Sequence, residues 1–262
     1  AMLQETVLLC LIAAVAAGIN AVAGGGTLLT FPALVAVFVA RGLDPDSAKV
    51  LANGTSTVGL FPATMAALWG YRSEFAATRH WLARLIPPSL VGGTTGALLV
   101  TQLPERSFAS MVPWLILVAA SLFTLQPLIA KRLGIGKAHE APTAKTMLGI
   151  MLFQSIVGVY GGYFGAGIGI LMLSALAMMG MSNIHAMNGL KSLLGGCING
   201  SAVVIFITSG TVEWPLAISM AISGCIGSYA AARIARRLPT KLVRSFVIAV
   251  GFSLATYYFL RG

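Results

Sequence analysis

The chain has 262 residues, of which 57% are hydrophobic and 9% are charged, and its mean hydropathy is +0.89. A water-soluble domain of this length cannot bury so much apolar surface, so the composition excludes a soluble globular protein and predicts an integral membrane protein. The formal net charge of +10 does not indicate nucleic-acid binding, because basic loops that face anionic lipid give the same sum.

Two apolar stretches of the chain are too long for a single membrane crossing. At 1.5 Å per residue, residues 5–40 and 146–179 would each form a helix about 50 Å long, whereas a hydrocarbon core is about 30 Å thick. Each of these stretches is therefore expected to bend. Six further stretches are long enough to cross as ordinary helices: residues 50–70, 85–103, 108–130, 187–208, 214–233 and 242–260.

A glycine-rich break interrupts both overlong stretches. The first break lies at 23–27 and the second at 161–169. Further matches follow in the same order along the chain, with Asn53 opposite Lys191, so the two halves are predicted to be a duplication. Paired interruptions at corresponding places in two halves are typical of the substrate site of a transporter.

Charged loops predict how the overlong stretches bend. Three basic segments are expected in the cytoplasm by the positive-inside rule: residues 71–84, 131–145 and 233–244. A single crossing by 146–179 would place the second and third segments on opposite sides. We therefore expect 146–179 to enter and return, as a re-entrant pair or as two short spans, and 5–40 to do likewise.

The predicted fold is an all-α polytopic membrane protein of two inverted repeats. Each repeat is a broken or re-entrant helical hairpin followed by three transmembrane helices, giving about 8 to 10 membrane segments. The first repeat is expected at 1–133, a cytoplasmic linker at 134–145 and the second repeat at 146–262, with both termini periplasmic. The three cysteines lie in apolar segments and are expected to be unpaired.

The breaks also predict a binding site. Irregular backbone at membrane depth is tolerated only where it is buried in protein or lines a wet cavity. Half-helices starting near Thr27 and near Ile168 would direct unpaired N–H groups and positive dipole ends at the membrane centre, where an anion would bind. The alternative is that the break glycines only allow close helix packing, the role expected for Gly92 and Gly96.

Lys191 is the only charged residue predicted within an apolar span. A buried ammonium needs a counter-charge, and no carboxylate lies nearby in sequence, so an anionic substrate is the expected partner. The alternative is that Lys191 extends to the cytoplasmic surface. The candidate substrate-binding residues are Gly24, Gly25, Gly26, Thr27, Asn53, Gly165, Ala166, Gly167, Asn188, Lys191, Ser192 and Asn199, with Asn20, Gln154, Tyr160 and Tyr163 as weaker candidates beside the breaks.

Several of these positions resemble a known family. The glycine run at 24–26, followed by Pro32, Gly42 and Asn53, resembles the first half of the TauE/SafE sulfite exporter family, and residues 158–199 resemble its second half. The resemblance covers nearly the whole chain. It implies a bacterial inner-membrane permease for small anions such as sulfite, sulfoacetate or related organosulfonates.

The expected function is secondary transport of a small anion, with an anion channel of the same architecture as the alternative. An intramembrane enzyme is disfavoured, because the spans contain no His-Glu-x-x-His or Gly-x-Ser-x-Gly motif and no paired aspartates. No cofactor or metal is expected. The expected partners are the anion and the lipid bilayer, with a homodimer left open and nucleic acid excluded.

Overall fold

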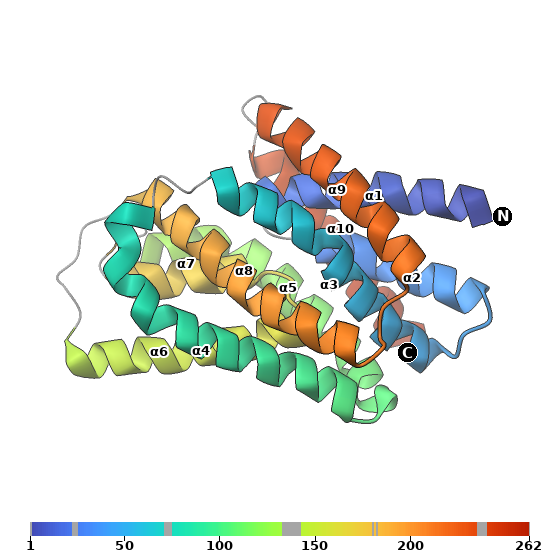
Figure 1. Cartoon of the computed structure of the whole chain (residues 1–262), viewed down its shortest axis with the longest axis horizontal. Helices are drawn as coiled ribbons and strands as arrows, with labels where there is room; N and C mark the ends of the chain where they lie inside the picture. Colours follow the sequence, from blue (N-terminus) through green and yellow to red (C-terminus); the bar gives the residue numbers. More distant parts are fainter. Residues whose placement is uncertain are drawn as a thin grey trace.

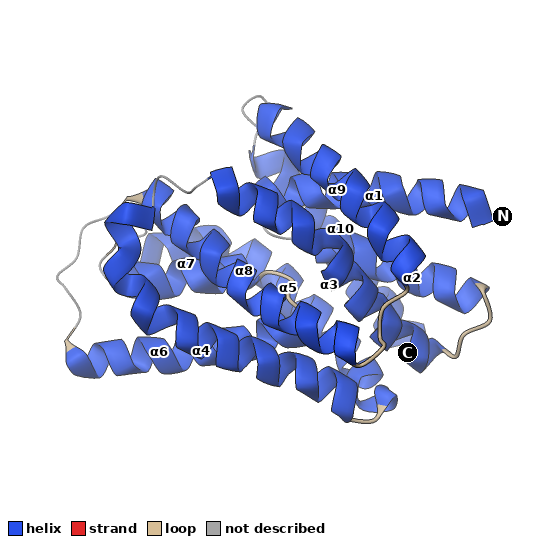
Figure 2. Cartoon of the chain, viewed as in Figure 1, coloured by secondary structure: helices blue, strands red, loops and turns tan. Residues whose placement is uncertain are grey.

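The computed structural model describes residues 2–22, 26–70, 75–132, 143–179, 181, 183–234 and 240–261, and these residues form an all-helical protein (Figure 1, Figure 2). The helices in the described residues are α1 (Met2–Val22), α2 (Thr27–Ala40), α3 (Pro45–Gly70), α4 (Phe75–Gln102), α5 (Glu105–Arg132), α6 (Ala144–Tyr163), α7 (Ile168–Met178), α8 (Ile184–Thr208), α9 (Trp214–Ile234) and α10 (Thr240–Arg261). The six predicted ordinary spans correspond to α3, α4, α5, α8, α9 and α10.

Both overlong stretches are divided in two. The predicted half-helix starts are confirmed, since α2 begins at Thr27 and α7 begins at Ile168. The second break depends on glycine at two positions, because Gly165 has a φ of 82° and Gly167 a φ of 80°. L-residues with a Cβ adopt this left-handed conformation only at a cost in free energy.

The prediction of a loop at 71–84 is wrong for residues 75–84, because α4 already begins at Phe75. Residues 75–84 contain alanine, leucine and arginine and neither glycine nor proline, so they favour a helix. Hydropathy did not predict this N-terminal part of α4, because it measures the length of the apolar segment and a helix can extend beyond that segment. Likewise α6 begins at Ala144, inside the predicted linker, where the Thr143 side chain caps it.

The helices pack in groups that do not follow the two halves of the chain. Helix α4 packs against α6 and α8, whereas α9 packs against α1 and α3. We call α1, α2, α3 and α9 the first bundle, and α4, α6, α7 and α8 the second bundle. Figure 1 shows α1 beside α9 along one edge of the molecule and α4 beside α6 along the opposite edge. Helices α5 and α10 pack on each other; α5 also contacts both bundles, and α10 contacts α2 of the first bundle.

Apolar side chains cover the outside as well as the core. On α6, Leu148, Leu152 and Ile156 form an exposed stripe with helical spacing, a face suited to lipid rather than to water. Three described helices are long and apolar enough to cross a bilayer: Glu105–Arg132, Ala144–Tyr163 and Ala186–Thr208. The three cysteines are free, as predicted.

Candidate functional site

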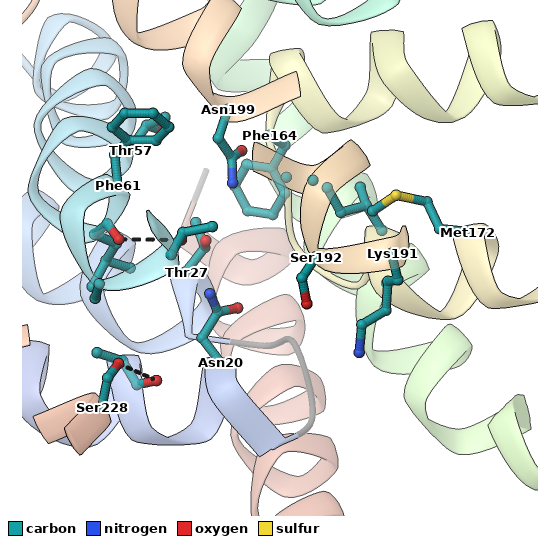
Figure 3. Close-up of a pocket in the computed structure, with 18 residues that line it drawn as sticks. Asn20, Thr27, Thr57, Phe61, Phe164, Met172, Lys191, Ser192, Asn199 and Ser228 are labelled. Atoms are coloured by element: carbon teal, nitrogen blue, oxygen red, sulfur yellow. Dashed lines mark hydrogen bonds between the residues drawn. The ribbon is translucent and has the colours of Figure 1, made fainter. Parts of the chain in front are cut away.

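A cavity of about 110 Å³ lies between the two bundles, beside both helix breaks (Figure 3). From the first bundle it is lined by Ala17, Asn20, Thr27, Thr57, Leu60, Phe61, Ala63, Thr64 and Ser228. From the second bundle, including the second break, it is lined by Phe164, Gly165, Ile168, Gly169, Met172, Lys191, Ser192, Gly195 and Asn199.

The starts of two half-helices reach this cavity. Thr27 is the first residue of α2, and Ile168 and Gly169 are the first two residues of α7. The first N–H groups of a helix have no partner inside the helix, and the helix dipole adds positive potential at that end. The backbone alone therefore makes the cavity favourable for a negatively charged group.

Helix α8 supplies polar donors that have no partner among the described residues. Among the described residues, the side chains of Lys191, Ser192 and Asn199 form no hydrogen bond or ion pair with one another or with any other described residue. Figure 3 shows the Lys191 and Ser192 side chains extending from α8 in the same direction. No aspartate or glutamate is among the described residues that line the cavity. One ammonium group, one amide and one hydroxyl on α8 are thus available to a ligand.

The α3 side of the cavity is chemically different. The Thr57 hydroxyl donates to the Asn53 carbonyl oxygen at 2.8 Å, and the Thr64 hydroxyl donates to the Leu60 carbonyl oxygen at 3.2 Å. A hydroxyl has a single proton to donate, so these two groups have none left for an anion. With the ring of Phe61 beside them, they form the less polar wall.

Side chains stabilise the second break. The Asn53 side-chain amide donates to the Tyr163 carbonyl oxygen at 3.0 Å, and the Tyr160 hydroxyl donates to the Ala166 carbonyl oxygen at 2.8 Å. These bonds pair carbonyl groups that the interrupted helix leaves without partners.

The predicted site residues divide into two sets. Thr27, Gly165, Lys191, Ser192 and Asn199 line the cavity, as does the weaker candidate Asn20. Those outside its lining are Gly26, Asn53, Ala166, Gly167, Asn188, Gln154, Tyr160 and Tyr163. Gly24 and Gly25 lie outside the described residues.

Several residues outside the lining have a structural setting of their own. Gly26 packs against α1, where an added Cβ would overlap the Ala16 carbonyl oxygen, and Gly167 faces Ala119 of α5. Gln154 donates to the Ser89 hydroxyl at 2.9 Å, between α6 and α4.

Sequence reasoning missed the apolar part of the lining, including Phe61, Phe164 and Met172. Phe61 lies one helical turn after Thr57 and two turns after Asn53, so the spacing along α3 contained a usable signal. Ala17 and Ser228 gave no such signal, because small residues occur throughout apolar helices.

Comparison with known proteins decides the family. The profile of the family described as "Sulfite exporter TauE/SafE" matches residues 9–258. This chain belongs to the TauE/SafE family. The resemblance noted in the sequence is thereby confirmed, and the family together with the apolar helices identifies a multi-pass membrane transporter.

Curated TauE/SafE relatives have names of the same kind. The chain is 27% identical to "Probable membrane transporter protein ORF9" of Sinorhizobium sp, over 93% of this chain and 88% of the relative. It is 26% identical to "Probable membrane transporter protein YfcA" of Escherichia coli K12, over 91% and 84%. It is 24% identical to a "Probable membrane transporter protein" of Haemophilus influenzae, over 92% and 89%. No solved structure matches the chain significantly.

Proposed function

We propose that this protein is a secondary transporter that exports small anions, such as sulfite, sulfoacetate or related organosulfonates. The observation that carries the proposal is the group of Lys191, Ser192 and Asn199, which face the cavity without partners among the described residues. Charge-assisted hydrogen bonds from such donors favour an oxyanion. The starts of α2 and α7 add positive potential at the same place.

We propose that the chain consists of two inverted repeats, residues 1–133 and 146–262, joined by a cytoplasmic linker at 134–145. The helix contacts support this arrangement because most of them occur in matched pairs. Helix α4 packs on α6 and α8 as α9 packs on α1 and α3, and α2 touches α10 as α7 touches α5. Exchanging the five helices of one half with those of the other leaves these contacts unchanged.

The proposed location is the bacterial inner membrane, with both termini in the periplasm. The basic segments at 71–84, 131–145 and 233–244 then lie in the cytoplasm, in keeping with the positive-inside rule. An inside-negative potential favours the outward movement of an anion by about 2.3 kcal/mol per charge per 100 mV. Export therefore needs no coupled cation.

The direct test is anion efflux from liposomes that contain the purified full-length protein. Liposomes loaded with sulfite or sulfoacetate should release the anion in a saturable manner, faster under an inside-negative potential, and protein-free liposomes should not. A carrier should also show accelerated exchange when the same anion is present outside. Large single-channel currents without accelerated exchange would identify a channel, and the absence of protein-dependent efflux for sulfite, sulfoacetate and a simple organosulfonate would overturn the proposal.

A further inference from the structure

We propose that Asn53 is a positioning residue that joins the two bundles, and that the cavity changes sides when the bundles, rather than the halves of the chain, move against each other. The proposal rests on the proposed transport function. The test of this inference measures movement of the bundles in the absence of substrate, so the inference and the transport function can fail separately.

Each bundle is held together by backbone-to-backbone contact. In the second bundle, a Cβ added at Gly92, Gly96 or Gly162 would overlap a carbonyl oxygen across the interface between α4 and α6. In the first bundle, a Cβ added at Gly227 of α9 would overlap the Ala14 carbonyl oxygen of α1. Helices in such close contact have little freedom to slide, because backbone atoms cannot change rotamer to make room.

The contact between the bundles is made differently. It lies mainly between α3 and α8, where Gly196 and Gly200 of α8 face the side-chain ends of Met65 and Phe61. A methionine methyl group and a phenylalanine ring edge can move into new positions, so this interface can rearrange without bending a helix. The lining of the cavity is divided along the same interface, and movement there would open or close it.

The hydrophobic core follows the bundles in part. The larger cluster of buried apolar residues includes members of both bundles and of α5 and α10. A second cluster runs from Leu85 of α4 through α6 and α7 to Ile198 of α8, and all its buried members belong to the second bundle or to the residue that caps α7. A continuous core of this kind is expected of a unit that moves as one body.

Hydrogen bonds between helices show the same division. Thr30 and Ser56 share a hydrogen bond within the first bundle, and Gln154 donates to Ser89 within the second. Two further side-chain hydrogen bonds between described residues of these helices, from Cys10 to the Ser219 carbonyl oxygen and from Ser228 to the Ala17 carbonyl oxygen, also stay inside one bundle. The exception is the bond from Asn53 of α3 to the Tyr163 carbonyl oxygen of α6.

The properties of Asn53 suit a contact that must break in each cycle. The residue is 1% exposed, and its amide oxygen has no partner among the described residues, so one hydrogen bond fixes the amide group. The net contribution of a single neutral hydrogen bond to stability is small, so substrate binding can readily offset its loss. Its acceptor, Tyr163, directly precedes Phe164 and Gly165 of the cavity lining, so breaking the bond releases the backbone at the binding site.

The test uses pairs of spin labels at lipid-facing positions on the full-length protein in lipid nanodiscs, with the three native cysteines replaced by alanine. Val15, Val91 and Ile156 are 55%, 65% and 67% exposed and lie on α1, α4 and α6. Val15 and Val91 share a half of the chain but not a bundle. Val91 and Ile156 share a bundle but not a half. Pulsed electron spin resonance gives both distance distributions.

Two variants remove the amide donor: Asn53→Ala, and Asn53→Leu, whose side chain is similar in size to asparagine. Gln154→Leu is the matched control, because it removes a buried amide inside one bundle. We expect both Asn53 variants to shift the Val15–Val91 distribution by about 5 Å, one helical turn, and to leave Val91–Ile156 unchanged. Gln154→Leu should change neither distance. An unchanged Val15–Val91 distribution in both variants, or an equal shift in Val91–Ile156, would overturn the proposal.

Discussion

Helices α3 and α8 occupy matching places in the two proposed repeats and line the same cavity, yet their chemistry differs. On α8, Lys191, Ser192 and Asn199 have donors to spare among the described residues. On α3, the hydroxyl protons of Thr57 and Thr64 are already donated to carbonyl groups of their own helix. In the proposed repeats, corresponding stretches of backbone form the cavity, while the difference in side chains places the charge on one wall. The affinity for an anion should therefore depend far more on the side chains of α8 than on those of α3.

The largest effect is expected from Lys191→Met, which removes the cation of the α8 wall and keeps much of its volume. Because a hydrogen bond to a charged group contributes about 1.5–3 kcal/mol, sulfite binding should weaken by about 10- to 100-fold. Isothermal titration of the purified protein measures this. Lys191→Arg keeps the charge and should recover part of the affinity.

Lys49→Met is the matched control for this change. Lys49 is a buried lysine of α3, but it lies outside the cavity lining and pairs with Asp46 at 3.6 Å. The Lys49→Met variant should bind sulfite as tightly as the wild type. Wild-type affinity of Lys191→Met for sulfite would show that the charge on the α8 wall does not contribute to anion binding.

A smaller effect is expected from Asn199→Ala, which removes a neutral donor of the same wall. The loss of one neutral hydrogen bond corresponds to about a 3- to 10-fold weaker dissociation constant. Asn188→Ala is the control, since Asn188 lies on α8 but outside the lining. Equal losses in both variants would mean that the effect comes from the stability of α8, which thermal unfolding of the two variants would reveal.

The smallest effect is expected from Thr57→Val on the α3 wall. The Thr57 hydroxyl already donates to the Asn53 carbonyl oxygen. Its loss should therefore change sulfite affinity by about twofold or less, the size of effect that is usual for a substitution that removes no special interaction. Thr101→Val removes a similar hydroxyl from α4, outside the cavity. A tenfold loss in Thr57→Val alone would show that α3 binds the anion directly, contrary to the comparison.

The breaks and the charged residue could be predicted because each leaves a strong local signal. A helix of 5–40 or 146–179 is too long for a bilayer, and glycine marks where it must stop. Lys191 is a single charge in an apolar span. Position along the proposed repeat puts Asn53 opposite Lys191, but position does not determine a side-chain partner, and the Asn53 amide donates to the Tyr163 carbonyl oxygen.

The sequence does not predict that α4 and α9 exchange places, with α4 of the first half packing against α6 and α8 and α9 of the second half packing against α1 and α3. The packing role expected for Gly92 and Gly96 is confirmed, but a small-residue face indicates only that another helix approaches closely. It does not identify that helix. Similarly, α3 carried a regular pattern of polar residues, and only the contacts of Thr57 and Thr64 showed that their protons were already in use.

The same exchange has a consequence for biosynthesis. Helix α1 ends at Val22 but receives its neighbour α9 only after residue 214 has been made, and the glycine face of α4 waits for α6. Membrane insertion and tertiary folding are therefore separated in time, and contacts so distant along the chain form slowly. A product truncated after α5 contains neither complete bundle and should be removed by membrane proteases.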